Sequence, residues 1–525
     1  MDSLLFHDLV HSPGCMRPDA ARIALREGQR SLSFGALAEQ VASLAGGFLR
    51  LGLARRDRVA VYLPKTLECV TSALATTAAG GIFVPVNPVL KPAQVAHILN
   101  DSGARFLVTS PDRVGALKDT LDGLASPPQV ILSEPNPNSQ HPDLVTLATL
   151  AEDAGGPALP HVIDADIAAI LYTSGSTGRP KGVVLSHRNL TVGAASVASY
   201  LAIDAHDRLL AVLPLAFDYG LNQITTALRM NAEAILMDYL LPREVIKVAA
   251  RHAVTGLAGV PPLWNQLAHL DWPDEAVDNL RYITNSGGAM PQATLGNLRE
   301  RLHRTKVYLM YGLTEAFRST YLPPEQIDQR PTSMGQAIPS AEILVVRPDG
   351  SECAPNEPGE LVHRGVLVAQ GYWNDAERTQ ARFRPAPNAL PGLPNPELAV
   401  WSGDTVYRDE DGYLYFVARD DAMIKSSGYR ISPEELEDAV YATGTVAMCA
   451  ALGKPDPALG QKIVLVLKPG PGFDADALRR TLRQTLPGYM VPHEMIPLDD
   501  LPHNPNGKID RSALKARYGQ ADENA

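Results

Sequence analysis

The residues with the clearest chemical capacity form one short run, 173–181, directly after the apolar stretch 167–170. Glycines in this run let the backbone approach an anion closely, hydroxyl groups can donate hydrogen bonds, and Lys181 adds a positive charge. Such a loop can hold a polyphosphate. It is not a Walker loop, because Lys181 lies between Pro180 and Gly182 and not in a Gly-Lys-Ser/Thr sequence. A surface turn without function is the alternative, and this composition fits it poorly. Besides Lys181, the expected phosphate ligands are Thr173, Ser174, Gly175, Ser176, Thr177 and Gly178.

Four more motifs follow this loop along the chain. They are Tyr-Gly-Leu-Thr-Glu at 311–315, Ser-Gly-Asp at 402–404, a stretch from 419 to 431 that ends in Gly-Tyr-Arg-Ile, and Pro-Asn-Gly-Lys-Ile-Asp-Arg at 505–511. Together with the loop they resemble the motifs of the adenylate-forming superfamily, which includes acyl-CoA synthetases, adenylation domains of nonribosomal peptide synthetases, and luciferases. The resemblance covers essentially the whole chain, and five motifs in the family's order are far more specific than one. It implies an enzyme that uses ATP and Mg²⁺ to join AMP to a carboxylic acid.

The resemblance also assigns the residues of the nucleotide site. Tyr311 would offer its ring to the adenine, Asp404 would accept the ribose hydroxyls, and Arg419 would meet the ribose and the phosphates. Thr314 would lie near the α-phosphate, and Glu315 would bind Mg²⁺ through a hard carboxylate oxygen. Alone, each of these residues also fits a plain structural role at a strand end or in a solvated turn. Bare backbone would lie against the adenine at Gly287, Gly288 and Ala289.

The same resemblance makes Lys508 the catalytic lysine, although a lysine in a polar loop such as 504–510 is in general a solvated surface charge. Lys508 would bridge the substrate carboxylate and the α-phosphate and stabilise the charge that develops in the transition state. The C-terminal part would then rotate about a hinge at Asp421 and withdraw Lys508, so that a phosphopantetheine thiol could attack the adenylate. Lys425 and Gly428 would line the tunnel for that thiol. The implied catalytic set is Lys508, Thr314, Glu315 and Lys181.

The acid that is activated depends on the segment 213–223, which contains Phe217-Asp218. In fatty acyl-CoA synthetases the sequence at this position resembles Pro-Leu-Phe-His. Amino-acid-activating domains have Phe-Asp instead, and their aspartate binds the ammonium group of the substrate. The resemblance therefore favours an amino acid. Carried over from those domains, the remaining pocket positions give a polar and rather small lining, which argues against a long alkyl chain. They are Tyr219, Asn222, Gly259, Thr284, Ser286, Met310, Arg318 and Ser319.

Arg318 leaves this interpretation open. If it faces the pocket, it can pair with Asp218 and silence the ammonium site, or it can bind an acidic group on the substrate. If it faces away, it anchors the following loop. The segments 311–324 and 217–223 also look like the acyl ligases found beside exosortase gene clusters, whose acid is not settled.

The acceptor of the acyl group is likewise open between two thiols. No carrier or condensation domain follows in the 525 residues, so we expect a stand-alone ligase. The favoured interpretation is transfer of an activated amino acid to the phosphopantetheine of a separate carrier protein. The alternative is an acyl-CoA synthetase that forms the CoA thioester of a small or medium carboxylic acid.

The elements that must position these residues alternate between strands and helices in the first 340 residues, which indicates parallel βαβ units. Helices are expected at 37–51, 67–78 and 91–99, and strands at 58–63, 82–86, 105–108, 208–213, 234–238, 254–257, 280–284 and 306–310. We expect loops without a core of their own at 126–160 and 384–396. Short strands at 342–346, 359–363 and 413–417 favour an antiparallel, barrel-like portion. A small α+β unit follows, with a helix over 433–441 capped by Ser432 and a strand at 462–467.

We therefore predict an α/β fold with two domains. A large N-terminal domain, 1–420, would hold two mostly parallel sheets flanked by helices, the barrel-like portion, and the sites for ATP and the acid. A small, mobile α+β domain, 421–525, would carry the catalytic lysine.

Composition excludes several other classes of function. The chain has 47 Lys and Arg against 58 Asp and Glu, a net charge of −11, so general binding to nucleic acid or to an anionic membrane is not expected. The four cysteines are far apart and form no CxxC pair, which argues against a zinc ribbon and suits a reducing compartment. The apolar stretch 70–90 is interrupted by polar residues and proline, and the first residues lack a basic segment. We expect a cytoplasmic protein without a membrane span.

Overall fold

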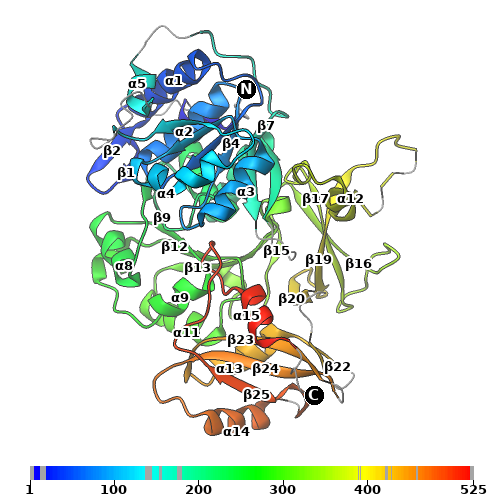
Figure 1. Cartoon of the computed structure of the whole chain (residues 1–525). Helices are drawn as coiled ribbons and strands as arrows, with labels where there is room; N and C mark the ends of the chain where they lie inside the picture. Colours follow the sequence, from blue (N-terminus) through cyan, green and yellow to red (C-terminus); the bar gives the residue numbers. More distant parts are fainter. Residues whose placement is uncertain are drawn as a thin grey trace.

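The computed structural model describes residues 5–11, 19–135, 145–152, 157–173, 180–387, 389–390, 392–419, 424–426, 429–456, 459–486 and 488–520. Within this part of the chain the strands form four sheets of nine, six, five and five strands. Figure 1 shows the two larger sheets together in the N-terminal part, an antiparallel sheet beside them, and the C-terminal sheet below. The predicted α/β class is confirmed.

The six-stranded sheet has the order β6-β5-β3-β4-β7-β8 and is parallel except for the antiparallel pair β7 and β8. Helices α2, α3 and α4 connect its strands, and α2 has the predicted bounds. The strands are β3 (Arg58–Tyr62), β4 (Ile82–Pro85), β5 (Phe106–Thr109), β6 (Gln129–Leu132), β7 (Ile167–Thr173) and β8 (Lys181–Ser186), and the helices are α2 (Leu67–Ala78), α3 (Pro92–Ser102) and α4 (Pro111–Asp122). The run expected to bind phosphate therefore connects two antiparallel strands.

The nine-stranded sheet has the order β15-β14-β13-β12-β11-β9-β10-β1-β2, with a parallel centre and antiparallel strands at both edges. Its strands are β1 (Ile23–Glu27), β2 (Arg30–Ser33), β9 (Arg208–Ala211), β10 (Glu233–Leu236), β11 (Gly256–Gly259), β12 (Tyr282–Asn285), β13 (Lys306–Tyr311), β14 (Thr320–Leu322) and β15 (Gln336–Ala337). The predicted strands at 208–213, 234–238, 254–257, 280–284 and 306–310 all correspond to strands of this sheet. Their carboxyl ends meet at one edge, where ligands bind in open parallel sheets.

Helices between the two larger sheets give them a common core. α2 contacts β3, β4 and β1, while α6 packs on α7 and α7 contacts β9 and β10. Every residue of α7 from Asp218 to Leu228 is buried, as expected for a helix covered on all sides. The helices of this part are α1 (Phe34–Arg50), α5 (Leu147–Ala151), α6 (His187–Leu201), α7 (Asp218–Arg229), α8 (Pro242–Arg251), α9 (Pro261–Leu267), α10 (Asp274–Asn279) and α11 (Gln292–Arg301).

One predicted loop is partly wrong. The segment 126–160 contains β6 and α5, and Leu147 and Leu150 of α5 are buried in the main core. α5 packs so closely on α1 that a Cβ at Gly47 would lie 2.4 Å from the carbonyl oxygen of Leu150. Prolines and polar residues on both sides concealed these two short elements. Residues 136–144 and 153–156 lie outside the described part of the chain.

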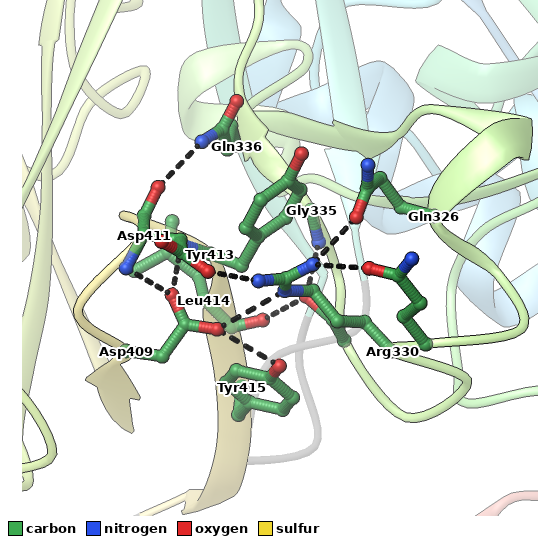
Figure 2. A network of polar contacts seen from close by, with 11 residues as sticks. Gln326, Arg330, Gly335, Gln336, Asp409, Asp411, Tyr413, Leu414 and Tyr415 are labelled. Atoms are coloured by element: carbon green, nitrogen blue, oxygen red, sulfur yellow. Dashed lines mark hydrogen bonds and ion pairs between the residues drawn. The ribbon is translucent and has the colours of Figure 1, made fainter.

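The antiparallel, barrel-like portion is confirmed as a five-stranded sheet of β16 (Ala341–Val346), β17 (Gly359–Gly365), β18 (Phe383–Pro385), β19 (Leu398–Arg408) and β20 (Leu414–Arg419), with α12 (Ala376–Arg382) beside it. Arg330 joins this sheet to the larger one, as Figure 2 shows. Its Nε lies 3.3 Å from Oδ2 of Asp409, and its guanidinium lies 4.3 Å above the ring of Tyr413. The amide of Leu414 donates to the carbonyl of Gly335 (2.8 Å), so the start of β20 is held against β15.

The chain from 424 onward forms a separate sheet of β21 (Ile424–Ser426), β22 (Tyr429–Ile431), β23 (Val446–Asp456), β24 (Gly460–Pro469) and β25 (Glu494–Pro497), covered by α13 (Pro433–Tyr441), α14 (Ala475–Thr485) and α15 (Arg511–Tyr518). The predicted helix 433–441 is confirmed, and the Ser432 hydroxyl accepts from the amide of Glu435. Two apolar clusters lie wholly within this part. The predicted domain limit at 420/421 lies outside the described residues and stays a prediction. No helix of the described chain is long and apolar enough to cross a bilayer.

Two helical glycines give opposite predictions for stability. At Gly220 in α7, an added Cβ would lie 2.1 Å from the carbonyl oxygen of Pro214, whereas at exposed Gly115 in α4 it would meet nothing within 4 Å. Gly220→Ala should destabilise the protein by at least about 1–3 kcal/mol through forced displacement of backbone. Gly115→Ala should stabilise α4 by about 0.5–1 kcal/mol. Thermal unfolding of the two variants checks both signs, and equal shifts would contradict the close packing at α7.

Candidate active site

The candidate site lies at the carboxyl edge of the nine-stranded sheet. Gly259 ends β11, Ser286 follows β12, and Tyr311 ends β13, so parallel pairing brings the three together. Asp218 is the first residue of α7, whose N-terminus favours a negative charge. The topology thus gathers residues that are far apart in sequence along one edge.

Two residues flank the expected phosphate loop. Thr173 at the end of β7 and Lys181 at the start of β8 are directly paired across the hairpin. Oγ1 of Thr173 is buried and has no hydrogen-bond partner within the described chain, so it is available to a ligand. The other expected ligands, Ser174, Gly175, Ser176, Thr177 and Gly178, lie outside the described residues.

Lys181 and Glu315, expected at the phosphates and at Mg²⁺, contact each other. Nζ of Lys181 lies 2.8 Å from Oε1 of Glu315 and 2.8 Å from the hydroxyl of Tyr372, which also donates to Glu315. Burial alone would raise the pKa of Glu315, but the cations of Lys181 and Arg382 lower it to about 2. The carboxylate is therefore ionised throughout the physiological range and suited to a hard cation.

Tyr372 and Arg382 were missed by the sequence analysis. The segment 370–373 pairs with β8, with the amide of Val184 donating to Gly371 and the amide of Trp373 donating to Gly182, and this pairing brings Tyr372 to Lys181. Arg382 ends α12, and its Nε is buried without a hydrogen-bond partner in the described part of the chain. Neither position has a sequence signal of its own, because strand pairing over almost 200 residues places Tyr372 and the fold of α12 places Arg382.

The residues expected at the adenosine also meet. The hydroxyl of Tyr311 donates to Oδ2 of Asp404 (2.5 Å), and Asp404 is buried in β19. Arg419 lies opposite Asp404 in the pairing of β19 with β20, which brings its backbone to the same place. The Arg419 side chain lies outside the described atoms. Ser286 is buried, whereas Gly288 and Ala289 are exposed at the rim.

Lys508 enters the site from the C-terminal part. Its Nζ lies 5.1 Å from the centre of the Phe217 ring, and a Cβ added at Gly287 would lie 2.5 Å from its Cε. Gly287 has φ of 82°, so both its conformation and the space it leaves suit glycine. Figure 1 shows the chain before α15 reaching up toward the large sheet. Nδ2 of Asn87 holds this loop by donating to the carbonyl of Pro505 (2.7 Å).

Asp218 is paired with Arg318, not open to a substrate ammonium group. Nη1 of Arg318 donates to Oδ2 of Asp218 (2.9 Å), and the Thr314 hydroxyl donates to Oδ1 (3.0 Å). The side chains of Arg318 and Asp218 are only 2% and 3% exposed, so the pair is shielded from water. Of the orientations left open for Arg318, the structure contains the one that occupies the carboxylate.

The pocket expected for the acid is small. A cavity of about 30 Å³, roughly the volume of one water, is lined by Tyr219, Asn222, Thr284 and Met310 of the expected set. The Tyr219 and Thr284 hydroxyls lie 2.5 Å apart and bond to each other, while leucine, isoleucine and valine side chains make up much of the remaining wall. Gly259 lies behind this wall, where an added Cβ would lie 2.7 Å from the indole of Trp264. Ser319 faces His363 instead of the cavity (3.0 Å).

The remaining expected residues concern the thiol and the hinge. Gly428 and Asp421 lie outside the described residues, and only the backbone of Lys425 is described, within β21. No group of three or more His, Cys, Asp or Glu that could hold a metal occurs among the described residues. A single carboxylate such as that of Glu315 is sufficient for Mg²⁺, which typically takes one or two carboxylates together with substrate phosphates and water.

The chain is similar to known proteins over nearly its whole length. Residues 16–373 match the family profile described as AMP-binding enzyme, and 435–508 match the AMP-binding enzyme C-terminal domain. A feruloyl-CoA synthase of an Amycolatopsis species is 32% identical over 96% of this chain and 97% of its own. A sulfoacetate–CoA ligase of Cupriavidus necator is 30% identical over 95% and 94%. Bacitracin synthase 3 of Bacillus licheniformis is 28% identical over 93% of this chain, but over 7% of its own length.

A solved structure agrees with the fold. ATP-bound MatB from Rhodopseudomonas palustris superposes with a TM-score of 0.86 and 25% identity, over 99% of both chains. The buried, unpartnered Thr173 Oγ1 and Arg382 Nε, with Lys181 and Glu315, fit a polyphosphate and its metal.

Removing Lys181 should make stability depend on pH through Glu315. In the wild type the pKa of Glu315, about 2, lies below its ordinary 4.5, so the ionised carboxylate stabilises the fold above pH 4.5 and this stabilisation is lost as the pH falls toward 2. Lys181→Met leaves a buried carboxylate with weaker compensation, and its pKa rises. The variant should lose about 1–3 kcal/mol at pH 7 and less at pH 5. Thermal unfolding from pH 5 to 8 measures this loss.

The control is Lys181→Met combined with Glu315→Gln, which removes the titrating group. Its difference from the wild type should stay constant over the same range. A single variant whose loss does not change with pH would show that Lys181 does not set the ionisation of Glu315.

Proposed function

The chain belongs to the AMP-binding enzyme family and is an ATP-dependent, AMP-forming acid–thiol ligase, and from this premise we propose that it forms the CoA thioester of a small polar carboxylic acid. The first half-reaction joins the acid to AMP and releases pyrophosphate. In the second, the thiol displaces AMP from the adenylate. No protein nucleophile takes part, so catalysis consists of positioning and charge stabilisation.

The observation that carries the first half-reaction is the position of Lys508. Lys508 contacts Phe217, which precedes α7, and Gly287, which follows the carboxyl end of β12. There its ammonium group can hold the substrate carboxylate and stabilise the charge that moves onto the α-phosphate. We propose Thr314 as a second donor to that phosphate, after its hydroxyl turns away from Asp218.

The phosphate side is served by Lys181, Arg382 and Thr173. A bound polyphosphate can draw Lys181 away from Glu315, and Mg²⁺, which neutralises charge between phosphates, can then take the freed carboxylate. The pair of Lys181 with Glu315 would then be replaced by two pairs, Lys181 with phosphate and Glu315 with Mg²⁺. No buried charge would be left without a partner. The Tyr372 hydroxyl, whose pKa is raised by burial and by Glu315, stays protonated and keeps donating to Glu315.

The acid is proposed to lack an α-ammonium group. Asp218, which would have to bind that group, is already paired with Arg318 and accepts from Thr314. The cavity beyond is too small for a long alkyl chain, and its largely apolar lining includes the polar groups of Tyr219, Asn222 and Thr284. This replaces the amino acid favoured by the Phe217-Asp218 motif alone.

Coenzyme A is the proposed acceptor. Relatives that this chain matches over most of their own length include a feruloyl-CoA synthase, a sulfoacetate–CoA ligase and a long-chain-fatty-acid–CoA ligase. The peptide synthase matches over a small part only. A separate carrier protein remains the second candidate, because its phosphopantetheine presents the same thiol.

Lys508→Ala should separate the two half-reactions. Pyrophosphate exchange into ATP should fall by at least about 100-fold, because charge in the transition state loses its counterion. Thioester formation from supplied acyl-adenylate should stay within a few-fold of the wild type. Lys515→Ala, an exposed lysine on α15, should leave both rates unchanged. Equal loss of both half-reactions in Lys508→Ala would contradict the assignment.

A substrate panel tests the acid and the acceptor. Pyrophosphate exchange is measured with amino acids, short polar acids and fatty acids, and thioester formation with CoA and with a carrier protein. We expect exchange with short polar acids and thioester on CoA. Exchange with amino acids only would show that an ammonium group displaces Arg318 from Asp218. Thioester on the carrier protein alone would favour the second candidate.

A further inference from the structure

Arg318 has one edge of its guanidinium paired and the other edge without a partner. Nη1 donates to Asp218 (2.9 Å) and to the carbonyl of Phe317 (3.0 Å). Nε and Nη2 are buried and find no acceptor in the described part of the chain. Buried N–H groups without partners are costly, and a charged group makes the cost larger.

These two donors lie on the same edge of the guanidinium. Nε and Nη2 together present parallel N–H groups that match the two oxygens of a carboxylate, whereas a single hydroxyl fills only one of them. An edge of this kind selects a planar oxyanion over an alcohol or an alkyl group. The paired edge, with Asp218, fixes the orientation of the open one.

Arg318 lies beside the acid pocket, against one of the residues that line it. Cζ of Arg318 is 4.4 Å above the ring of Tyr219, and Tyr219 lines the small cavity. Tyr219 in turn packs edge-on against Phe217, with ring centres 6.1 Å apart. The ammonium group of Lys508 lies over the Phe217 ring. Arg318 and Lys508 are thus two cations at the two ends of one aromatic pair.

Unusual backbone fixes Arg318 in this place. Phe317 has φ of 57° and ψ of −48°, which is costly for a residue other than glycine. Its buried ring occupies space left free at Gly193, where an added Cβ would lie 2.5 Å from Cδ1 of Phe317. The turn directs the next residue, Arg318, to Asp218.

We propose that the acid activated by this enzyme carries a second oxyanion, a carboxylate in the simplest case, and that the Nε–Nη2 edge of Arg318 binds it. Lys508 holds the carboxylate that reacts, and Arg318 holds the one that does not. The inference rests on the proposed function, because it names the substrate class of the same pocket. Asp218 orients Arg318 and also lowers its net attraction for an anion.

The test compares dicarboxylates with their monoamides, which keep shape and one acceptor oxygen but lose the second charge. Malonate, succinate and glutarate are each paired with the monoamide, and kcat/KM for adenylation is measured with the wild type. We expect at least one dicarboxylate to be favoured over its monoamide by about tenfold or more. A protein that adenylates monoamides and neutral acids as well as dicarboxylates overturns the inference and leaves the proposed function intact. A protein that adenylates no acid overturns the proposed function.

Two variants at the ion pair should act in opposite directions. Arg318→Gln should lower the preference for the dicarboxylate about tenfold or more, mainly through KM. Asp218→Asn keeps Arg318 and removes the competing negative charge, so it should raise the preference several-fold. A salt bridge with a structural role only would lose activity alike in both variants, with the preference unchanged, and this result would overturn the inference.

Arg318→Lys covers the case in which Arg318→Gln does not fold. It keeps the charge but has no planar edge, so it should retain part of the preference for the dicarboxylate and lose the rest. A preference equal to that of the wild type would show that the open edge is not used.

Discussion

The buried ion pair of Asp218 and Arg318 is the interaction on which the acid side of this site depends. Taking both charges out of water is expensive, and their attraction offsets that cost only when geometry and further hydrogen bonds are favourable. Here Asp218 begins α7 and accepts from Thr314 as well, while Arg318 follows the strained turn at Phe317. Three elements therefore hold one pair: α7, the turn after β13, and α6, against which the Phe317 ring of that turn packs. A change in any of them moves the pocket.

The pair also links the acid pocket to the nucleotide site. Thr314 donates to Asp218, and next to it Glu315 binds Lys181 and Tyr372. Both residues belong to one turn, so a nucleotide that attracts Thr314 and Glu315 alters the hydrogen bonds of Asp218 at the same time. In the proposed arrangement, two adjacent side chains, Thr314 and Glu315, would couple the two substrates directly. Lys508 closes the arrangement from the opposite side and comes from a part of the chain with its own core.

Sequence reasoning was most successful where a pattern is local. The helix at 67–78, the cap at Ser432 and the strands that lead to Ser286 and Tyr311 follow from periodicity and capping residues in short windows. The order of the motifs predicts the nucleotide site, and in the structure Lys181 contacts Glu315 and Tyr311 contacts Asp404. Tyr372 and Arg382 could not be predicted in this way. Strand pairing with β8 brings Tyr372 to Lys181, α12 places Arg382 near Glu315, and no local pattern records either approach. The partner of Asp218 was left open by the sequence for a related reason. Its residue type fits an ammonium group, yet its partner is decided by a turn 100 residues away.

The electrostatics explain how an acidic protein can hold several anions. The net charge of −11 is a property of the whole chain, whereas the candidate site gathers Lys181, Arg382, Arg318 and Lys508 from four separate elements. Two of these cations are held by an internal carboxylate, Lys181 by Glu315 and Arg318 by Asp218. Burying a cation that is paired with a carboxylate costs less free energy than burying an unpaired cation, but the paired cation attracts an anion less strongly. The carboxylates of Glu315 and Asp218 differ in which group could replace their cation partner. In the proposed function Glu315 would bind a metal ion and release Lys181, whereas Asp218 would stay with Arg318 and leave only the second edge of Arg318 for an anion. The phosphate side is therefore suited to strong, metal-dependent binding, and the acid side to selection by geometry.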